Sequence, residues 1–144
     1  MKRKLLKFLV LCLSLTILAG CGSEKPLEPV EGELLSRSDA LFMVKVQDAN
    51  HATVTFKNLA ETYLYIGHES KLHMRRDGVW YNIPIIEDKR WPEYSLGLPL
   101  GGKKIQEMVF EEWYGSLEPG EYRLIKPVYG GGDPMYVFAE FVIE

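Results

Sequence analysis

Cysteine is scarce in this chain, which excludes a fold held together by disulfide bonds. The 144 residues include two cysteines, Cys12 and Cys21, and both lie close to the N-terminus. We expect neither to serve the folded body as a disulfide partner, a thiol nucleophile or a thiolate metal ligand. A hydrophobic core must therefore supply the stability, and residues 39–144 are enough to build one.

Catalytic and metal-binding patterns are also missing. His68 and His73 are five residues apart, and on a strand such odd spacing places two side chains on opposite faces. The adjacent Glu111 and Glu112 point apart for the same reason, whereas a glycosidase needs two carboxylates that face one another. The glycine run at 130–132 lacks the lysine that follows in a phosphate-binding loop. We therefore expect no enzyme, no metal and no cofactor.

Basic residues are sparse outside the first 20 positions. The chain has 17 Lys and Arg against 20 Asp and Glu, and four of the basic residues lie in those first 20 positions, which hold no acid. The remainder keeps 13 basic and 20 acidic side chains, a formal charge of about −7. Such a body repels nucleic acid and anionic lipid head groups, so we expect no nucleic-acid partner.

Long hydrophobic runs are absent except for one, Phe8–Leu18, which follows a basic leader. That run is too short to cross about 30 Å of hydrocarbon as a permanent helix. It ends in Leu-Ala-Gly-Cys at 18–21, and a basic region, an apolar region and small residues together describe an export signal. A plain secretory signal and an uncleaved anchor are the alternatives.

The Leu-Ala-Gly-Cys motif resembles the lipobox of bacterial lipoproteins. The resemblance implies a signal peptide at 1–20, cleavage between Gly20 and Cys21, and a diacylglyceryl group on the thiol of Cys21. It also implies a protein held by its lipid on the extracytoplasmic face of the cell membrane. Residues 21–38 are rich in proline and glutamate, so we expect a flexible tether there and a single domain at 39–144.

From Leu41 onward, hydrophobic residues alternate with polar ones, the period of a half-buried strand. Asp48–Asn50 and Asp77–Gly78 are expected to be hairpin turns, and the Asp-Gly pair is a strong signal because both of its residues accept positive φ. The stretch Ile86–Leu100 is expected to be a long loop. The expected strands lie near 41–47, 53–57, 62–66, 71–76, 79–83, 103–110, 122–126 and 136–143. This pattern predicts an all-β antiparallel sandwich of about seven or eight strands.

The stretch Leu117–Tyr122 predicts a tyrosine corner. Pro119 and Gly120 suit a type II turn, with proline fixing φ at the second position and glycine supplying positive φ at the third. Tyr122 opens the next strand, from which its hydroxyl can fold back onto the backbone of the corner. The alternative is an ordinary Pro-Gly turn beside an unrelated tyrosine.

With its neighbours at 113–123, this corner resembles the signature of a bacterial immunoglobulin-like domain family found in exported proteins and lipoproteins. The segments 54–58, 76–80 and 136–141 are similar to other strands of that family, and the resemblance covers about 41–144. It implies an immunoglobulin-like sandwich with no known catalytic activity, and it carries over no functional residue. The resulting hypothesis is a membrane-anchored binding or scaffolding lipoprotein whose partner is an envelope protein or a cell-wall polymer. The alternative is an accessory or inhibitor subunit of an envelope enzyme that acts by edge-strand pairing.

The loop at Ile86–Leu100 carries the candidate binding residues. Lys89, Arg90, Trp91 and Tyr94 give it the composition of a recognition surface supported on a rigid scaffold. In the alternative interpretation, Trp91 only plugs the open end of the sandwich.

Overall fold

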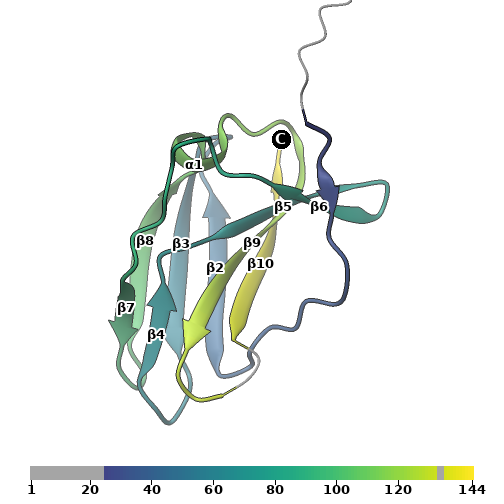
Figure 1. The fold of residues 1–144 in the computed structure, drawn as a ribbon. Helices are drawn as coiled ribbons and strands as arrows, with labels where there is room; N and C mark the ends of the chain where they lie inside the picture. The colour runs from purple at the N-terminus through teal and green to yellow at the C-terminus, as the bar shows by residue number, and fades with distance from the viewer. Residues whose placement is uncertain (1–24, 133–134) are drawn as a thin grey trace, which may run out of the picture.

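The fold is an all-β sandwich of two antiparallel sheets, seen in a computed structural model that describes residues 25–132 and 135–144 (Figure 1). The signal peptide predicted at 1–20 and the lipidation predicted at Cys21 lie outside these residues. Within the described ranges, no helix is both long and apolar enough to cross a membrane. The sequence-based prediction of an antiparallel sandwich is confirmed.

The smaller sheet has three strands in the order β2-β3-β8. Its strands are β2 (Ala40–Val46), β3 (His51–Asn58) and β8 (Lys103–Val109). The side chains of Phe42, Val54 and Phe56 face the core, while alternate positions face solvent, as the period-two pattern predicts. The hairpin between β2 and β3 closes through the amide of Gln47, which donates to the carbonyl of His51 at 2.9 Å.

The larger sheet has the order β1-β6-β5-β9-β4-β7, with β10 on the other side of β9. Its strands are β1 (Glu28–Pro29), β4 (Leu64–Gly67), β5 (Lys71–Arg76), β6 (Val79–Ile83), β7 (Ser95–Leu98), β9 (Gly120–Tyr129) and β10 (Tyr136–Ile143). β9 is long enough to pair with β5 along its first half and with β4 at its end. A break at 68–70 separates β4 from β5 beside Lys126 and Pro127 of β9.

The core lies between the sheets and is closed at one end by a short helix, α1 (Phe110–Tyr114). Phe42 and Phe56 stack across β2 and β3 with ring centroids 4.7 Å apart. Phe110 of α1 is fully buried and stacks on Phe141 at 5.4 Å, and Phe141 in turn stacks on Tyr122. The stack of Phe110 on Phe141 thus joins α1, which directly follows β8 of the smaller sheet, to β10 of the larger sheet.

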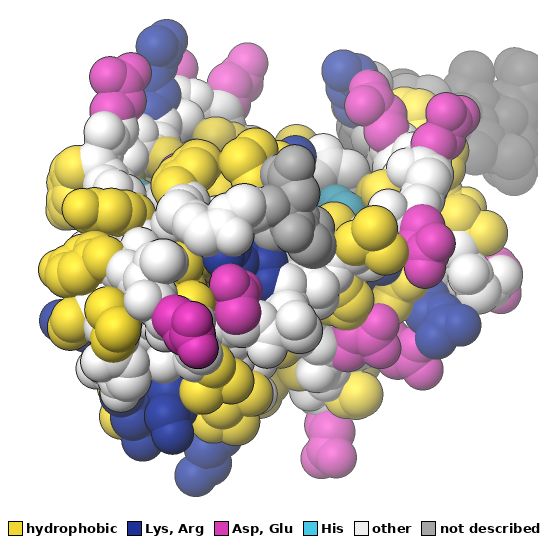
Figure 2. Space-filling model, turned by 90° about the horizontal axis from the view of Figure 1, so that it is seen from below, with side chains coloured by type: hydrophobic (Ala, Val, Ile, Leu, Met, Phe, Trp, Pro, Cys, Tyr) yellow, Lys and Arg dark blue, Asp and Glu magenta, His cyan; other side chains and the backbone are white. Residues whose placement is uncertain are grey.

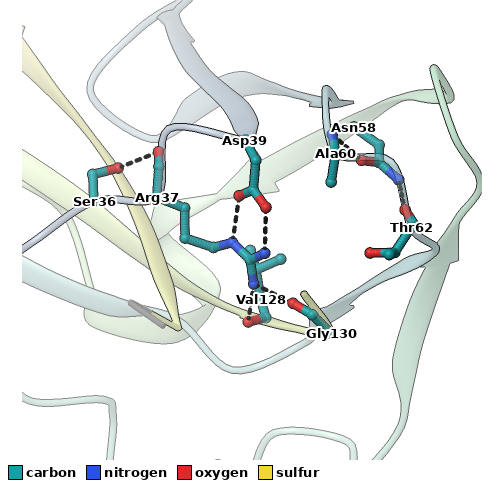
Figure 3. Close-up of polar contacts among 8 residues, drawn as sticks. All are labelled: Ser36, Arg37, Asp39, Asn58, Ala60, Thr62, Val128 and Gly130. Atoms are coloured by element: carbon teal, nitrogen blue, oxygen red, sulfur yellow. Dashed lines mark hydrogen bonds and ion pairs between the residues drawn. The ribbon is translucent and has the colours of Figure 1, made fainter. Parts of the chain in front are cut away.

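The segment expected to be a tether contacts the domain along part of its length. β1 pairs with β6, and the amide of Arg37 donates to the carbonyl of Tyr136 at 2.8 Å. The buried guanidinium of Arg37 binds both carboxylate oxygens of Asp39 at 2.7 Å (Figure 3). It also donates to the carbonyls of Val128 and Gly130, at 3.2 and 2.6 Å. Arg37 therefore fastens the entry to β2 onto the end of β9.

Two other local expectations differ from the structure. The loop expected at Ile86–Leu100 contains β7, which the edge of β4 draws into the sheet. With β7 and the short β1, the described residues form ten strands, against the seven or eight expected. Gly120 does not adopt positive φ, so Pro119 and Gly120 do not form the predicted type II turn. Gly120 instead begins β9, where a Cβ atom would lie 3.1 Å from Cε of Met74.

The predicted turn at Asp77 and Gly78 is confirmed. Their φ angles are 50° and 78°, the left-handed values that a two-residue hairpin of this type requires at both positions.

The Tyr122 hydroxyl donates to the carbonyl of Glu118 at 2.7 Å, which is the bond that a tyrosine corner makes. Leu117 is buried beside it.

Candidate functional site

The loop that precedes β7 is packed onto the sandwich through Trp91. The Trp91 ring stacks on Trp113 of α1, with centroids 3.6 Å apart and planes 14° apart. The amide of Ile86 donates to the carbonyl of Trp113 at 2.8 Å, which fixes the start of the same loop. Trp91 is half-buried against the core cluster, so it covers the gap between the sheets and offers little of its ring to a partner.

The other candidate residues of this loop differ from Trp91 in exposure. Lys89 and Arg90 are exposed, and the Lys89 ammonium lies 5.5 Å from the centre of the Trp113 ring. Tyr94 is 63% exposed, and its ring lies 4.1 Å from that of His68. Of the two aromatic side chains predicted to bind, Tyr94 is therefore the more exposed.

Tyr94 belongs to a group of four exposed tyrosines, which we call the tyrosine face. The other three lie at the outer face of the larger sheet, and Tyr94 lies at the neighbouring edge, where it lines a hollow together with Tyr129. The members of the tyrosine face are Tyr63, Tyr65, Tyr94 and Tyr129, which are 46%, 46%, 63% and 39% exposed. Tyr65 of β4 is flanked by Tyr129 on β9 and by Gly97 on β7. Gly97 leaves room for a neighbour, because a Cβ atom there would lie 2.6 Å from the Tyr63 hydroxyl. Tyr63 and Tyr65 lie with ring centroids 5.1 Å apart.

A hollow of about 380 Å³ opens beside the tyrosine face. Its lining residues are Gly67, Glu69, Trp91, Pro92, Glu93, Tyr94, Ser95 and Tyr129. The Tyr129 hydroxyl donates to Oε1 of Glu69 at 2.6 Å, and this bond raises the pKa of Tyr129 to about 12. The hollow thus combines aromatic surface with carboxylate and hydroxyl groups that form hydrogen bonds.

Hydrophobic side chains extend to the end of the sandwich where β3 joins β4 and β7 joins β8. Figure 2 views this end and shows them gathered on the side that carries β4, β7 and β8 in Figure 1. Leu59 and Leu100, in the loops at this end, are 52% and 60% exposed.

Tyr63, Tyr65 and Tyr129 were not predicted as candidate binding residues. The signal for Tyr65 was present, because it alternates with Leu64 and Ile66, which are both buried in β4. That pattern places Tyr65 on the outer face. The proximity of Tyr65 to Tyr94 and Tyr129 depends on strand order, which alternation does not reveal.

A second feature missed by sequence reasoning is a buried lysine between the sheets. Tyr122, Leu124 and Val128, at alternate positions of β9, belong to the core cluster between the sheets, whereas the buried Ile125 does not, and Lys126 has the same alternation as the first three. The Lys126 side chain therefore points inward, and it is only 8% exposed. Its ammonium donates to the carbonyl of His68 at 2.6 Å and to Oγ of Ser70 at 3.1 Å.

These two bonds have a structural origin in the break between β4 and β5. His68 and Ser70 lie in that break, beside β9, where Pro127 has no amide hydrogen to donate. The carbonyl of His68 therefore lacks a backbone amide donor from β9, and the ammonium of Lys126 donates to it instead. Burial lowers the pKa of Lys126 to about 8, and the charge of Glu69 only partly opposes this shift.

A metal-binding cluster is not found in the described parts of the chain. Within residues 25–132 and 135–144, no three His, Cys, Asp or Glu side chains are grouped so as to hold a metal ion. His73 accepts a hydrogen bond from Nε of Arg123 at 3.0 Å, and burial is the main cause that lowers its pKa to about 4. His73 therefore stays neutral at physiological pH and serves the packing of β5 against β9.

Comparison with known proteins assigns the fold to a family. A family model described as a bacterial Ig-like domain matches residues 43–142. A search of curated proteins found no match. Domains of this family are typically non-catalytic and suggest a binding or scaffolding module. With its two-sheet fold and a match over most of its length, this chain belongs to the bacterial Ig-like domain family.

Proposed function

We propose that this protein is a non-catalytic binding module, anchored in the cell membrane by lipid on Cys21, whose tyrosine face binds an uncharged polysaccharide of the cell envelope. The observation that carries the proposal is the set of four exposed tyrosines beside a hollow with two carboxylates. The membership of the chain in a family of typically non-catalytic modules supports binding without chemistry.

The chemistry of the tyrosine face favours a sugar as ligand. Aromatic rings present an apolar face with a polar hydroxyl at the tip, and the axial C–H groups of a pyranose ring pack well on such a surface. The carboxylates of Glu69 and Glu93 accept hydrogen bonds from sugar hydroxyls. The formal charge of about −7 outside the leader disfavours a polyanionic polymer.

The proposed anchor rests on the leader. An acidic body gains nothing from an anionic membrane surface, so attachment requires a lipid. In the native host, mass spectrometry is expected to find acyl chains on Cys21, and Cys21→Ser should release the protein from the membrane fraction. An unmodified Cys21 thiol in the mature protein would contradict the anchor but leave the tyrosine face untested.

Co-sedimentation with insoluble cell-wall polysaccharide tests the tyrosine face. We expect Tyr94→Ala and Tyr65→Ala each to weaken binding about tenfold, because each removes an exposed ring near the hollow. Met43→Ala is the matched control, since Met43 is 47% exposed on β2, in the other sheet. Unchanged sedimentation of both tyrosine variants would reject the proposed surface.

The strand order gives one observation in favour of the alternative, an accessory subunit that acts by edge pairing. Among the strands of residues 25–132 and 135–144, β7 pairs only with β4 and ends the larger sheet, so its outer edge is available to a strand of a partner. A photo-reactive residue at the exposed Ser95 distinguishes the two ideas in living cells. Cross-linking to one protein would favour edge pairing, and cross-linking to glycan would favour the tyrosine face.

A further inference from the structure

The amine of Lys126 lies at a small cavity between the two sheets, separate from the hollow at the tyrosine face. The cavity measures about 150 Å³. Its walls come from both sheets, from α1 and from the loop before β7, and the residues are Val54, His68, Ser70, Trp91, Pro92, Gln106, Glu107, Met108, Trp113, Leu124 and Lys126. The Lys126 ammonium lies 5.8 Å from the centre of the Trp91 ring. An apolar cavity of about this volume can hold a benzene ring.

Two buried hydrogen-bond donors at this cavity lack acceptors among the described residues. A lysine ammonium has three N–H groups, and Lys126 uses two of them on His68 and Ser70. Nε2 of His68 is buried and has no partner in the described parts of the chain. Burial and the nearby charge of Lys126 lower the pKa of His68, so its ring is neutral and can carry a proton on Nε2. Buried groups of this kind normally have partners, so the cavity is built for an acceptor.

We propose that the cavity binds the carboxylate of a small organic acid, which accepts hydrogen bonds from Lys126 and from Nε2 of His68. A carboxylate only accepts hydrogen bonds, so it matches both donors. The apolar part of the acid packs against Trp91 and Trp113, which close the cavity toward α1 and the preceding loop. The ligand class is therefore a monocarboxylic acid with an apolar body no larger than about one six-membered ring.

The charged groups around the cavity favour a ligand that carries a single negative charge. Lys126 is the one ammonium or guanidinium group among the lining residues, and the carboxylate of Glu107 lies on the outer face of β8, where it accepts hydrogen bonds from Gln47 and Thr53. Glu69 lies close enough to influence the pKa values of both His68 and Lys126. A dianion such as phosphate would meet one cation and the nearby carboxylate of Glu69, whereas a monoanion is neutralised by Lys126.

Titration of the full chain in detergent with benzoate and with benzyl alcohol, its neutral counterpart, tests the proposal. Binding is followed by calorimetry and by tryptophan fluorescence, because Trp91 and Trp113 line the cavity. We expect benzoate to bind at least tenfold more tightly than benzyl alcohol. Lys126→Met should weaken benzoate binding at least tenfold, while Lys45→Met, at an exposed position on β2, should leave it unchanged.

Proton uptake by the unmodified protein gives a second readout that does not depend on the folding of a variant. The titratable groups that interact with Lys126 are His68 and Glu69, and neither supplies a second cation at pH 8. A bound carboxylate holds Lys126 in its charged form, so benzoate should bind with uptake of protons near pH 8. Its affinity should fall about tenfold per pH unit above that value.

Three results would overturn the proposal. They are equal affinity for benzoate and benzyl alcohol, benzoate binding without proton uptake, and the absence of benzoate binding up to its solubility limit. The last result would mean that the two donors are satisfied by water alone.

Discussion

At the scale of single residues, the hydrogen bond of the Tyr122 hydroxyl is expected to stabilise the corner that precedes β9. Tyr122 is 2% exposed, and its hydroxyl donates to Glu118 at 2.7 Å. Tyr122→Phe keeps the buried ring and removes this bond, so we expect a loss of about 1 kcal/mol in the free energy of unfolding in urea. Tyr65→Phe, at an exposed position, should change it by less than about 0.5 kcal/mol.

The pair of Arg37 and Asp39 makes stability depend on acid pH. Hydrogen bonds from Arg37 are the largest cause of the lowered pKa of Asp39. A carboxyl group whose pKa is depressed on folding stabilises the native state above its unfolded value of about 3.9, and this contribution is lost as pH falls further. We expect acid unfolding below about pH 4 to depend less steeply on pH in Asp39→Asn than in the wild type. The exposed Glu93→Gln serves as the control, and equal slopes in the wild type and Asp39→Asn would contradict the prediction.

Lys126 predicts that stability also rises with pH in the alkaline range. Its pKa is about 8 in the folded state and about 10.4 in an unfolded chain, so the unfolded state binds more protons between these values. Stability should therefore rise from pH 8 toward pH 10, by at most about 1.4 kcal/mol per pH unit. Above about pH 10, the unfolded tyrosines lose protons that Tyr114 and Tyr129 retain in the fold, which reverses the trend.

Urea unfolding at several pH values measures this slope. Lys126→Met should abolish the rise between pH 8 and pH 10, while Lys45→Met should retain it. A wild type whose stability does not change across this window would show that Lys126 is not held in a desolvated state.

Residues whose roles depend on local chain geometry could be predicted from the sequence. Asp77 and Gly78 adopt the predicted positive φ, because a two-residue hairpin imposes that geometry by itself. The role of Gly120 could not be predicted, because it depends on the approach of Met74 from another strand. The inward position of Lys126 was predictable from alternation along β9, but its partners lie in a strand break that sequence alone does not reveal.

At the scale of elements, α1 and the loop before β7 form one unit held by the stack of Trp91 on Trp113. Trp113→Ala removes half of the stack and opens the cavity beneath it, so we expect a loss of about 2 kcal/mol in the free energy of unfolding. Hydrogen exchange should also become faster at 86–94. Faster exchange throughout the molecule, with no excess in this loop, would argue against a local role for the stack.

Strands were more predictable than their pairing. Each run of alternating residues became a strand, because one buried face requires period two whatever the neighbours are. β7 was missed because its sequence, Ser95–Leu98, is short and contains Gly97. It is a strand because β4 offers an open edge and Gly97 leaves room for Tyr63, which are tertiary facts.

At the scale of the whole molecule, the strand order of the larger sheet keeps β1 apart from the tyrosine face. β1 lies at one end of its strand order, and β4, which carries Tyr65, lies with β7 at the other (Figure 1). The same separation explains why the candidate site was only partly predictable. Its residues come from β4, β9 and the segment before β7, which are far apart in sequence and adjacent only in the sheet.

The pairing of β1 with β6 would limit how far the domain moves from the lipid that we propose on Cys21. Only residues 22–27 separate that cysteine from the first residue of β1, and six residues span at most about 20 Å. The sandwich would then lie close to the bilayer surface, with β1 nearest the lipid and the tyrosine face directed away from it. In that position, the tyrosine face would contact a polysaccharide of the surrounding cell wall without a conformational change in the domain.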